Sequence, residues 1–334
     1  MNTETTQSTE TAQSTETTHS RLSHMPISLF AVVMGLAGLT LAVRQGEQLW
    51  EIAQVLSTVL LVVSIGVYIA IAVAYSLKFL RYRESVTWEF NHPIRLSFFP
   101  AISIGLILIA ILLVPISAPL AKGLLIVGAA IQLVFTLVIL SAWIHQDRFQ
   151  ITHSNPAWFI PIVGNILVPV GGAPLGLIEV SWFFFSIGLV FWIVLLAILM
   201  NRYFFHSPMP SKLLPTLFIL IAPPAVGFIS WVNLHDGLID DTARILYYFG
   251  LFITLMLFFQ IRRFTTVPFG LPWWAYSFPL AAFTIATMMM CGAMGGWFFV
   301  VLSVMLLVAL TALLTMLVLK TIAAMRAGKI CVPE

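Results

Sequence analysis

Charge is what this sequence has least of. Only 9% of its 334 residues are Asp, Glu, Lys or Arg, whereas 60% are hydrophobic, and the mean hydropathy is +1.02. Soluble domains typically carry about 25% charged residues. The composition therefore excludes a water-soluble globular protein and indicates a chain that crosses a membrane several times.

Cysteines are also scarce, and the N-terminal residues do not have the pattern of a cleavable leader. The two cysteines, Cys291 and Cys331, are too far apart in sequence to suggest a metal pair, a redox pair or a disulfide framework. The first twenty residues contain no apolar core, and QSTET occurs in them twice, so we expect no signal peptide. A polar segment of this kind predicts a disordered tail over residues 1–24.

Ten hydrophobic runs approach or exceed the roughly 20 residues that a helix needs to cross a bilayer core of about 30 Å. We therefore expect an all-α membrane domain over 25–322, followed by a short cytoplasmic tail at 323–334. The runs fall near 26–43, 52–77, 94–114, 120–143, 157–173, 178–200, 212–232, 243–260, 273–291 and 294–319.

The positive charges are distributed unequally between the two sides of this arrangement. With ten spans, both termini lie on one side, together with thirteen of the 16 Lys and Arg residues; Arg44, Lys122 and Arg244 lie opposite. Loops rich in Lys and Arg stay in the cytoplasm during insertion. We therefore expect a multi-pass protein of the cell inner (plasma) membrane with both termini cytoplasmic.

Prolines mark an internal repeat. Each odd-numbered run has a proline at its start, and these prolines are 54 to 67 residues apart, which predicts five tandem helical hairpins. In four of the five runs a second proline follows five or seven residues later. These second prolines, which we expect to kink the helices, are Pro100, Pro161, Pro215 and Pro279.

A proline inside a membrane helix leaves a carbonyl without its donor, which is tolerated where neighbouring helices or water can supply one. The even-numbered runs are smoother and suit a lipid-facing position. We therefore expect an inner ring of five kinked helices around a central pore, with the other five helices outside. The alternative is that the prolines, which are common in membrane helices, mark only close packing.

Ionisable residues are nearly absent from the membrane interior. Ion-coupled pumps usually bind their coupling ion with intramembrane carboxylates or histidines, so a passive pore is the more economical hypothesis. Arg95 and Lys212, just inside two odd helices, together with the helix N-termini, predict a cytoplasmic mouth that favours anions. These cations could also simply follow the topology rule. No metal or cofactor is expected, because no typical ligand spacing occurs.

Several phenylalanines lie close to the prolines of the odd helices. A ring that points into a narrow apolar pore would plug it and keep it dry, although any one of these rings could equally belong to the packed core. The candidates are Phe30, Phe98, Phe99, Phe159 and Phe278.

Three stretches carry a family resemblance. GLPWWAYSFPLAAF at 270–283, HPIRLSFFPA at 92–101 and HSNPAWFIPIVGN at 153–165, together with the ten-helix repeat, resemble the tellurite-resistance/dicarboxylate transporter family, which includes TehA-like proteins and the slow anion channels of plants. The resemblance covers about residues 24–325. It implies five hairpins around a pore and a homotrimer in which each subunit has its own pore.

The resemblance also implies a gate. In this family a phenylalanine on the ninth helix closes the pore, and the WAxxF pattern places it at Phe278, with Phe283 as the fallback. Phe30, Phe99 and Phe159 are predicted only to line the pore, and Phe283 is also a pore-lining candidate.

The prediction is a gated passive channel for small monovalent anions such as chloride or nitrate. The alternative is a secondary transporter that exports dicarboxylates or tellurite-type oxyanions and confers tellurite resistance. An enzyme fits least, because the sequence has no nucleophile elbow, HExxH motif or carboxylate pair at membrane depth. The expected partners are small inorganic anions, the lipid bilayer and further copies of the chain, with no nucleic acid.

Overall fold

The computed structural model describes residues 21–332, so most of the predicted disordered tail at 1–24 lies outside the described residues. All ten predicted spans are helical. Nine are long and apolar enough to cross a membrane, and the segment Pro156–Gly172 is a shorter apolar helix. The odd-numbered spans contain α1 (Phe30–Leu49), α4 (Ala101–Leu113), α6 (Ile160–Gly172), α8 (Ala222–Leu234) and α11 (Ser277–Met294); the even-numbered spans are α2 (Val55–Arg81), α5 (Ala118–His145), α7 (Ile178–Phe205), α9 (Asp241–Phe259) and α12 (Trp297–Arg326).

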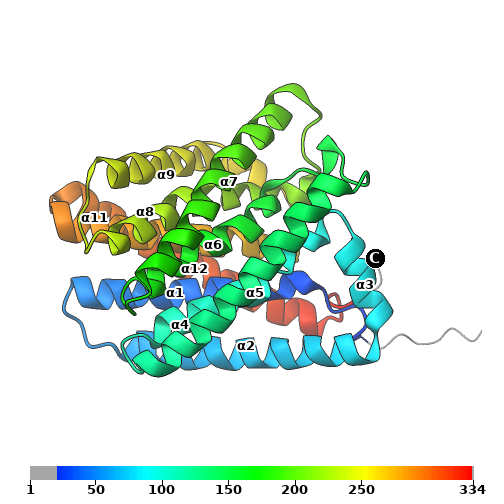
Figure 1. The fold of residues 1–334 in the computed structure, drawn as a ribbon, viewed down its shortest axis with the longest axis horizontal. Coiled ribbons are helices and arrows are strands. Elements are labelled where there is room, and N and C mark those ends of the chain that lie inside the picture. Colours follow the sequence, from blue (N-terminus) through cyan, green and yellow to red (C-terminus); the bar gives the residue numbers. More distant parts are fainter. Residues whose placement is uncertain (1–20, 333–334) are drawn as a thin grey trace, which may run out of the picture.

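The α-helices of the five odd-numbered spans form a closed inner ring. Around this ring, α1 contacts α4, α4 contacts α6, α6 contacts α8, α8 contacts α11, and α11 contacts α1. Each outer helix packs against two adjacent inner ones: α2 against α1 and α4, α5 against α4 and α6, α7 against α6 and α8, α9 against α8 and α11, and α12 against α11 and α1. Figure 1 shows α2 and α9 along opposite edges of the bundle. These contacts confirm the two predicted layers.

Burial separates the same two layers. In the apolar windows of the spans that contain α1, α4, α8 and α11, between 67 and 83% of the residues are buried. In the outer helices the range is 17 to 39%. The outer helices therefore present apolar side chains at the surface of the bundle, as a lipid environment requires.

The prolines act differently from the prediction. Each inner α-helix is preceded by a 3₁₀ segment, and three of the four second prolines, Pro100, Pro161 and Pro279, lie within three residues of the change from 3₁₀ to α. A proline has no amide to donate to the carbonyl four residues before it. For Pro100 and Pro161 that carbonyl accepts instead from the residue just before the proline: the Phe99 amide donates to the Leu96 carbonyl, and the Ile160 amide donates to the Ala157 carbonyl. An i→i+3 bond thus replaces the missing i→i+4 bond. The 3₁₀ segments are η1 (Ile27–Leu29), η2 (Arg95–Phe98), η4 (Pro156–Phe159), η5 (Ser211–Ile221) and η6 (Leu271–Tyr276).

The placement of the four prolines follows the same plan. Pro100 is the residue before α4, and Pro161 lies in the first turn of α6. Pro215 lies within η5, and Pro279 is the third residue of α11. Pro100, Pro161 and Pro279 are thus near the starts of α-helices, where a missing amide costs little because the first amides of a helix have no partner within it, whereas Pro215 lies inside η5.

Short helices that the sequence did not predict lie at the face where α1 begins and α12 ends, here named the terminal face. α3 (Arg83–Asn91) follows α2, and α10 (Ile261–Thr265) follows α9; η3 (Ile151–His153) is a further 3₁₀ turn after α5. α12 ends at Arg326, seven residues beyond the predicted run.

Inner and outer helices approach each other closely at glycines. A Cβ added to Gly188 of α7 would lie 2.3 Å from Ile166 Cγ1 and 2.8 Å from the Ile166 amide nitrogen of α6. A polar link joins the layers nearby: Gln132 of α5 donates to the Pro161 carbonyl of α6 and accepts from Ser103 of α4, both at 2.7 Å. Such bonds satisfy polar groups that cannot reach water.

Candidate functional site

A cavity of about 1260 Å³ opens at the terminal face. It lies at the centre of the ring, because every inner span contributes to its wall. Its border is completed by α3, by the last turn of α12 and by residues 329–332. The contributions of the five inner spans include Met34, Phe98, Val163, Ala222 and Phe278.

Cations outnumber acids around this terminal cavity. Among residues 21–332, the side chains with full charges in its wall are Lys78, Arg95, Lys212 and Lys329 against Glu84 and Glu89. A cavity with an excess of one charge and low-dielectric walls concentrates ions of the opposite sign. The terminal cavity can therefore attract anions.

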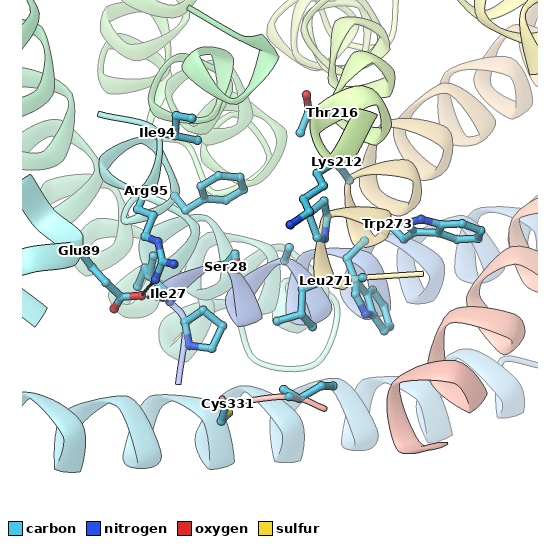
Figure 2. A pocket seen from close by; sticks show the side chains of 18 of the residues that line it. Ile27, Ser28, Glu89, Ile94, Arg95, Lys212, Thr216, Leu271, Trp273 and Cys331 are labelled. Atoms are coloured by element: carbon cyan, nitrogen blue, oxygen red, sulfur yellow. Dashed lines mark hydrogen bonds and ion pairs between the residues drawn. The ribbon is translucent and has the colours of Figure 1, made fainter. Parts of the chain in front are cut away.

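The two residues predicted for the mouth both line the cavity, from different inner spans. Arg95 belongs to η2; it forms an ion pair with Glu89 at 3.2 Å, and its guanidinium lies 4.6 Å from the Trp88 ring centroid. Lys212 is exposed and is the second residue of η5. No described Asp or Glu lies within ion-pair distance of Lys212. Figure 2 shows Arg95 and Lys212 reaching the cavity from different sides.

Beside Arg95, the wall contains a buried polar cluster that the sequence did not reveal. Glu89 Oε1 accepts from the Ile27 amide and from Arg95 Nη1, each at 3.2 Å. Glu89 Oε2 accepts from Tyr75 at 2.9 Å and from Lys78 at 2.7 Å. This set, named the Glu89 cluster, fastens α2, α3 and η2 to the start of the first span. Both Lys78 and Glu89 are 1% exposed.

The only sequence hint of the Glu89 cluster is an acid within a short stretch between two spans that is otherwise rich in cations. Lys78 also donates to the Met25 carbonyl at 2.8 Å. Residues 329–332 line the same cavity, and burial raises the pKa of the Cys331 thiol while Lys78 and Arg21 act in the opposite direction. The segment after α12 therefore lies against the cavity wall.

Phe278 lines the cavity from the second position of α11 and is 6% exposed. The Phe278 ring faces α1 at Gly38, which has no side chain. A Cβ on Gly38 would lie 3.5 Å from Phe278 Cδ2 and 2.9 Å from Ala281 Cβ. The ring is thus held between the cavity and a glycine surface of the neighbouring helix.

The other predicted phenylalanines pack elsewhere. Phe30 makes edge contacts with Tyr68 and Tyr75 of α2, with ring centroids 6.1 and 6.0 Å apart. Phe283 stacks on Tyr247 of α9 at 5.5 Å. These rings face outer helices, so the geometry does not support a pore-lining role for Phe30 or for the fallback Phe283.

The structure also does not support a pore-lining role for Phe99 in the third span or for Phe159 in the fifth span. Phe99 contacts Tyr75, Phe90 and Phe135, and its neighbour Phe98 lines the cavity instead. Phe159 is fully buried and is not part of the cavity wall that the described residues form.

Charged groups at the other end of α1 are also buried. Arg44 donates to the Leu112 carbonyl at the end of α4 at 2.5 Å, and Glu47 accepts from the Ser57 amide at 3.2 Å. Both side chains are 7% exposed. They tie the far end of α1 to α4 and α2.

The fold and the cavity define a polytopic α-helical membrane protein of five hairpins, with a cationic cavity at one end of its inner ring. The sequence profile of the voltage-dependent anion channel family matches residues 24–322. The chain belongs to this family, which confirms the resemblance carried by the ninth-helix block.

Known proteins with similar sequences include plant and bacterial members. The S-type anion channel SLAH2 of Arabidopsis thaliana is 32% identical over 274 residues, 80% of this chain and 52% of that protein. The guard cell S-type anion channel SLAC1 of the same plant is 27% identical over 289 residues, 83% of this chain and 51% of that protein. The tellurite resistance protein TehA homolog of Haemophilus influenzae is 29% identical over 262 residues, 77% of this chain and 79% of that protein. The chain spans about half the length of these plant relatives.

Proposed function

We propose that this protein is a gated passive channel for small monovalent anions such as chloride or nitrate, closed at rest by Phe278. The single observation that carries the proposal is the terminal cavity, to which all five inner spans contribute and in which cations exceed acids. The names of the plant relatives agree with anion passage.

The inner helices offer little with which to couple anion movement to protons. No Asp, Glu or His occurs within α4, α6, α8 or α11. Coupled transporters generally need such groups at membrane depth. A ring of apolar residues with aromatic side chains such as Phe98 and Phe278 in the wall of its cavity suits gating by exclusion of water.

The positions of the charges support a cytoplasmic terminal face, since most Lys and Arg residues lie on the side of the termini. The inner membrane of the cell is the proposed location. The exposed apolar surface of the outer helices suits contact with lipid and with further copies. The proposed homotrimer, with one pore per subunit, rests on the family resemblance.

The second candidate is a secondary transporter of dicarboxylates or tellurite-type oxyanions. It is favoured by the 29% identity to a protein named for tellurite resistance. Buried Glu47 in α1 is the acid that such a mechanism could use.

Reconstitution tests the two candidates against each other. For a channel, currents of the Phe278→Ala variant in planar bilayers should reverse at the anion equilibrium potential and respond to replacing chloride with nitrate. Liposomes should show no proton movement that depends on anion flux. Saturable flux that acidifies the lumen, and that falls when Glu47 is replaced by Gln, would support the transporter.

A further inference from the structure

Four donors converge on the carboxylate of Glu89. The Ile27 amide and Arg95 reach one oxygen, while Tyr75 and Lys78 reach the other, at 2.7 to 3.2 Å. Two of the donors are cationic, and this combination of donors is what a protein uses to bind an oxyanion. In this chain the oxyanion is supplied by the protein itself.

The Glu89 cluster lies in the wall of the terminal cavity, where Lys78, Glu89 and Arg95 are all lining residues. Without the carboxylate, two cations would face the route that anions take. A channel must attract an ion without retaining it. A doubly charged anion would be retained most, because its attraction to both cations is about twice that of a monovalent one.

We propose that Glu89 is a specificity-determining residue: its carboxylate permanently occupies a four-donor oxyanion site in the terminal cavity and so prevents divalent anions from binding there. The inference rests on the proposed channel function, in which anions pass through this cavity. Monovalent anions are then attracted by the remaining positive charge without being held.

Glu84 provides a matched control. It belongs to the same helix, α3, and lines the same cavity, but it is exposed. No described Lys or Arg lies within ion-pair distance of it. Replacing either glutamate by Gln removes one negative charge from the cavity wall, and only at Glu89 does the change leave two cationic donors facing a neutral side chain.

The test is sulfate block of chloride current, with Glu89→Gln and Glu84→Gln each placed in the Phe278→Ala background. Sulfate is added at the terminal face. We expect the half-blocking concentration to fall by about tenfold or more for Glu89→Gln, and by no more than about twofold for Glu84→Gln. Equal shifts for the two variants, or no shift in a folded Glu89→Gln protein, would overturn the inference.

Glu89→Gln leaves Lys78 buried opposite a neutral partner, which can prevent folding. The double variant Lys78→Met, Glu89→Gln removes the buried pair together and retains Arg95. It should still strengthen sulfate block by about threefold, and a further Arg95→Gln change should abolish that gain. An unchanged block in the folded double variant would overturn the inference.

Calorimetry separates this inference from the proposed function. Sulfate is titrated into detergent-solubilised wild-type protein and into Glu89→Gln. If Phe278→Ala carries no anion current, the channel proposal fails, yet sulfate binding by Glu89→Gln and not by the wild type would still support the masked oxyanion site. Failure of a folded Glu89→Gln protein to bind sulfate more tightly than the wild type would refute it.

Discussion

The contact between α1 and α11 beside the proposed gate gives a sharp prediction for Gly38→Ala. The added Cβ would lie 2.9 Å from Ala281 Cβ, closer than real Cβ atoms approach. Because Ala281 Cβ is attached directly to the backbone, no rotamer change can relieve the clash. An ordinary contact requires the two helices to move apart by about 0.5 Å.

Overpacking of this kind typically costs about 1–3 kcal/mol. Replacing a helical glycine by alanine returns about 0.5–1 kcal/mol through lower backbone entropy. We therefore expect Gly38→Ala to destabilise the protein by about 1–2 kcal/mol. Equilibrium unfolding in a detergent or bicelle system that unfolds reversibly provides the measurement.

Gly66→Ala in α2 is the control, since nothing lies within 4 Å of the Cβ it would add. It should be neutral or slightly stabilising. If Gly38→Ala is as stable as Gly66→Ala, the close approach of α1 and α11, and the seat that it gives Phe278, would be refuted.

Three further predictions follow from individual contacts. Gln132→Leu removes the hydrogen bond to the Pro161 carbonyl and should lower the unfolding free energy by about 1–2 kcal/mol, measured in the same unfolding system. The hydrogen bond from the Ala243 amide is the main cause that lowers the pKa of Asp240 from its ordinary value of 3.8. The stability that the Asp240 carboxylate contributes is therefore complete above pH 3.8 and is lost as the pH falls through the lower folded pKa. Melting temperatures at acidic pH should depend less on pH in Asp240→Asn than in the wild type. Lys212→Glu should reduce anion current in an open-pore background several-fold at about 0.05 M salt and much less at about 1 M, because salt screens the exposed charge.

The sequence predicted the two-layer ring because its pattern is repeated. Five proline-marked spans alternate with five smoother ones, and the need to satisfy carbonyls away from lipid assigns the first set to the interior. The structure agrees in every pair of neighbouring inner helices. The form of the helix starts was not predictable in the same way, because α and 3₁₀ segments share sequence preferences and differ by one hydrogen-bond step.

That difference bears on which of Phe98 and Phe99 lines the cavity. Successive side chains turn by about 100° in an α-helix and by about 120° in a 3₁₀ helix, so a short 3₁₀ segment shifts which residue faces the ring interior. Phe98 is the last residue of η2, and Phe99 follows it. For Phe278 the family pattern selected a residue that does line the cavity.

The Glu89 cluster could not be read from the chain, because its donors lie between 6 and 62 residues from Glu89 and come from separate helical elements. The amide of Ile27 is 62 residues from Glu89, and no local periodicity reports such a pair. Its assembly depends on how the first hairpin packs against the start of the second. Buried ion pairs of this kind become visible only when the helices are in place.

The most direct test of the central claim compares single-channel currents of Phe278→Ala and Phe283→Ala. Phe283 is fully buried and stacks on Tyr247 of α9, so its loss should weaken packing without opening a passage. The account predicts large anion currents for Phe278→Ala and currents at the wild-type level for folded Phe283→Ala. Wild-type currents from a folded Phe278→Ala protein, or equal opening by both variants, would contradict the claim that Phe278 closes an anion pathway through the inner ring.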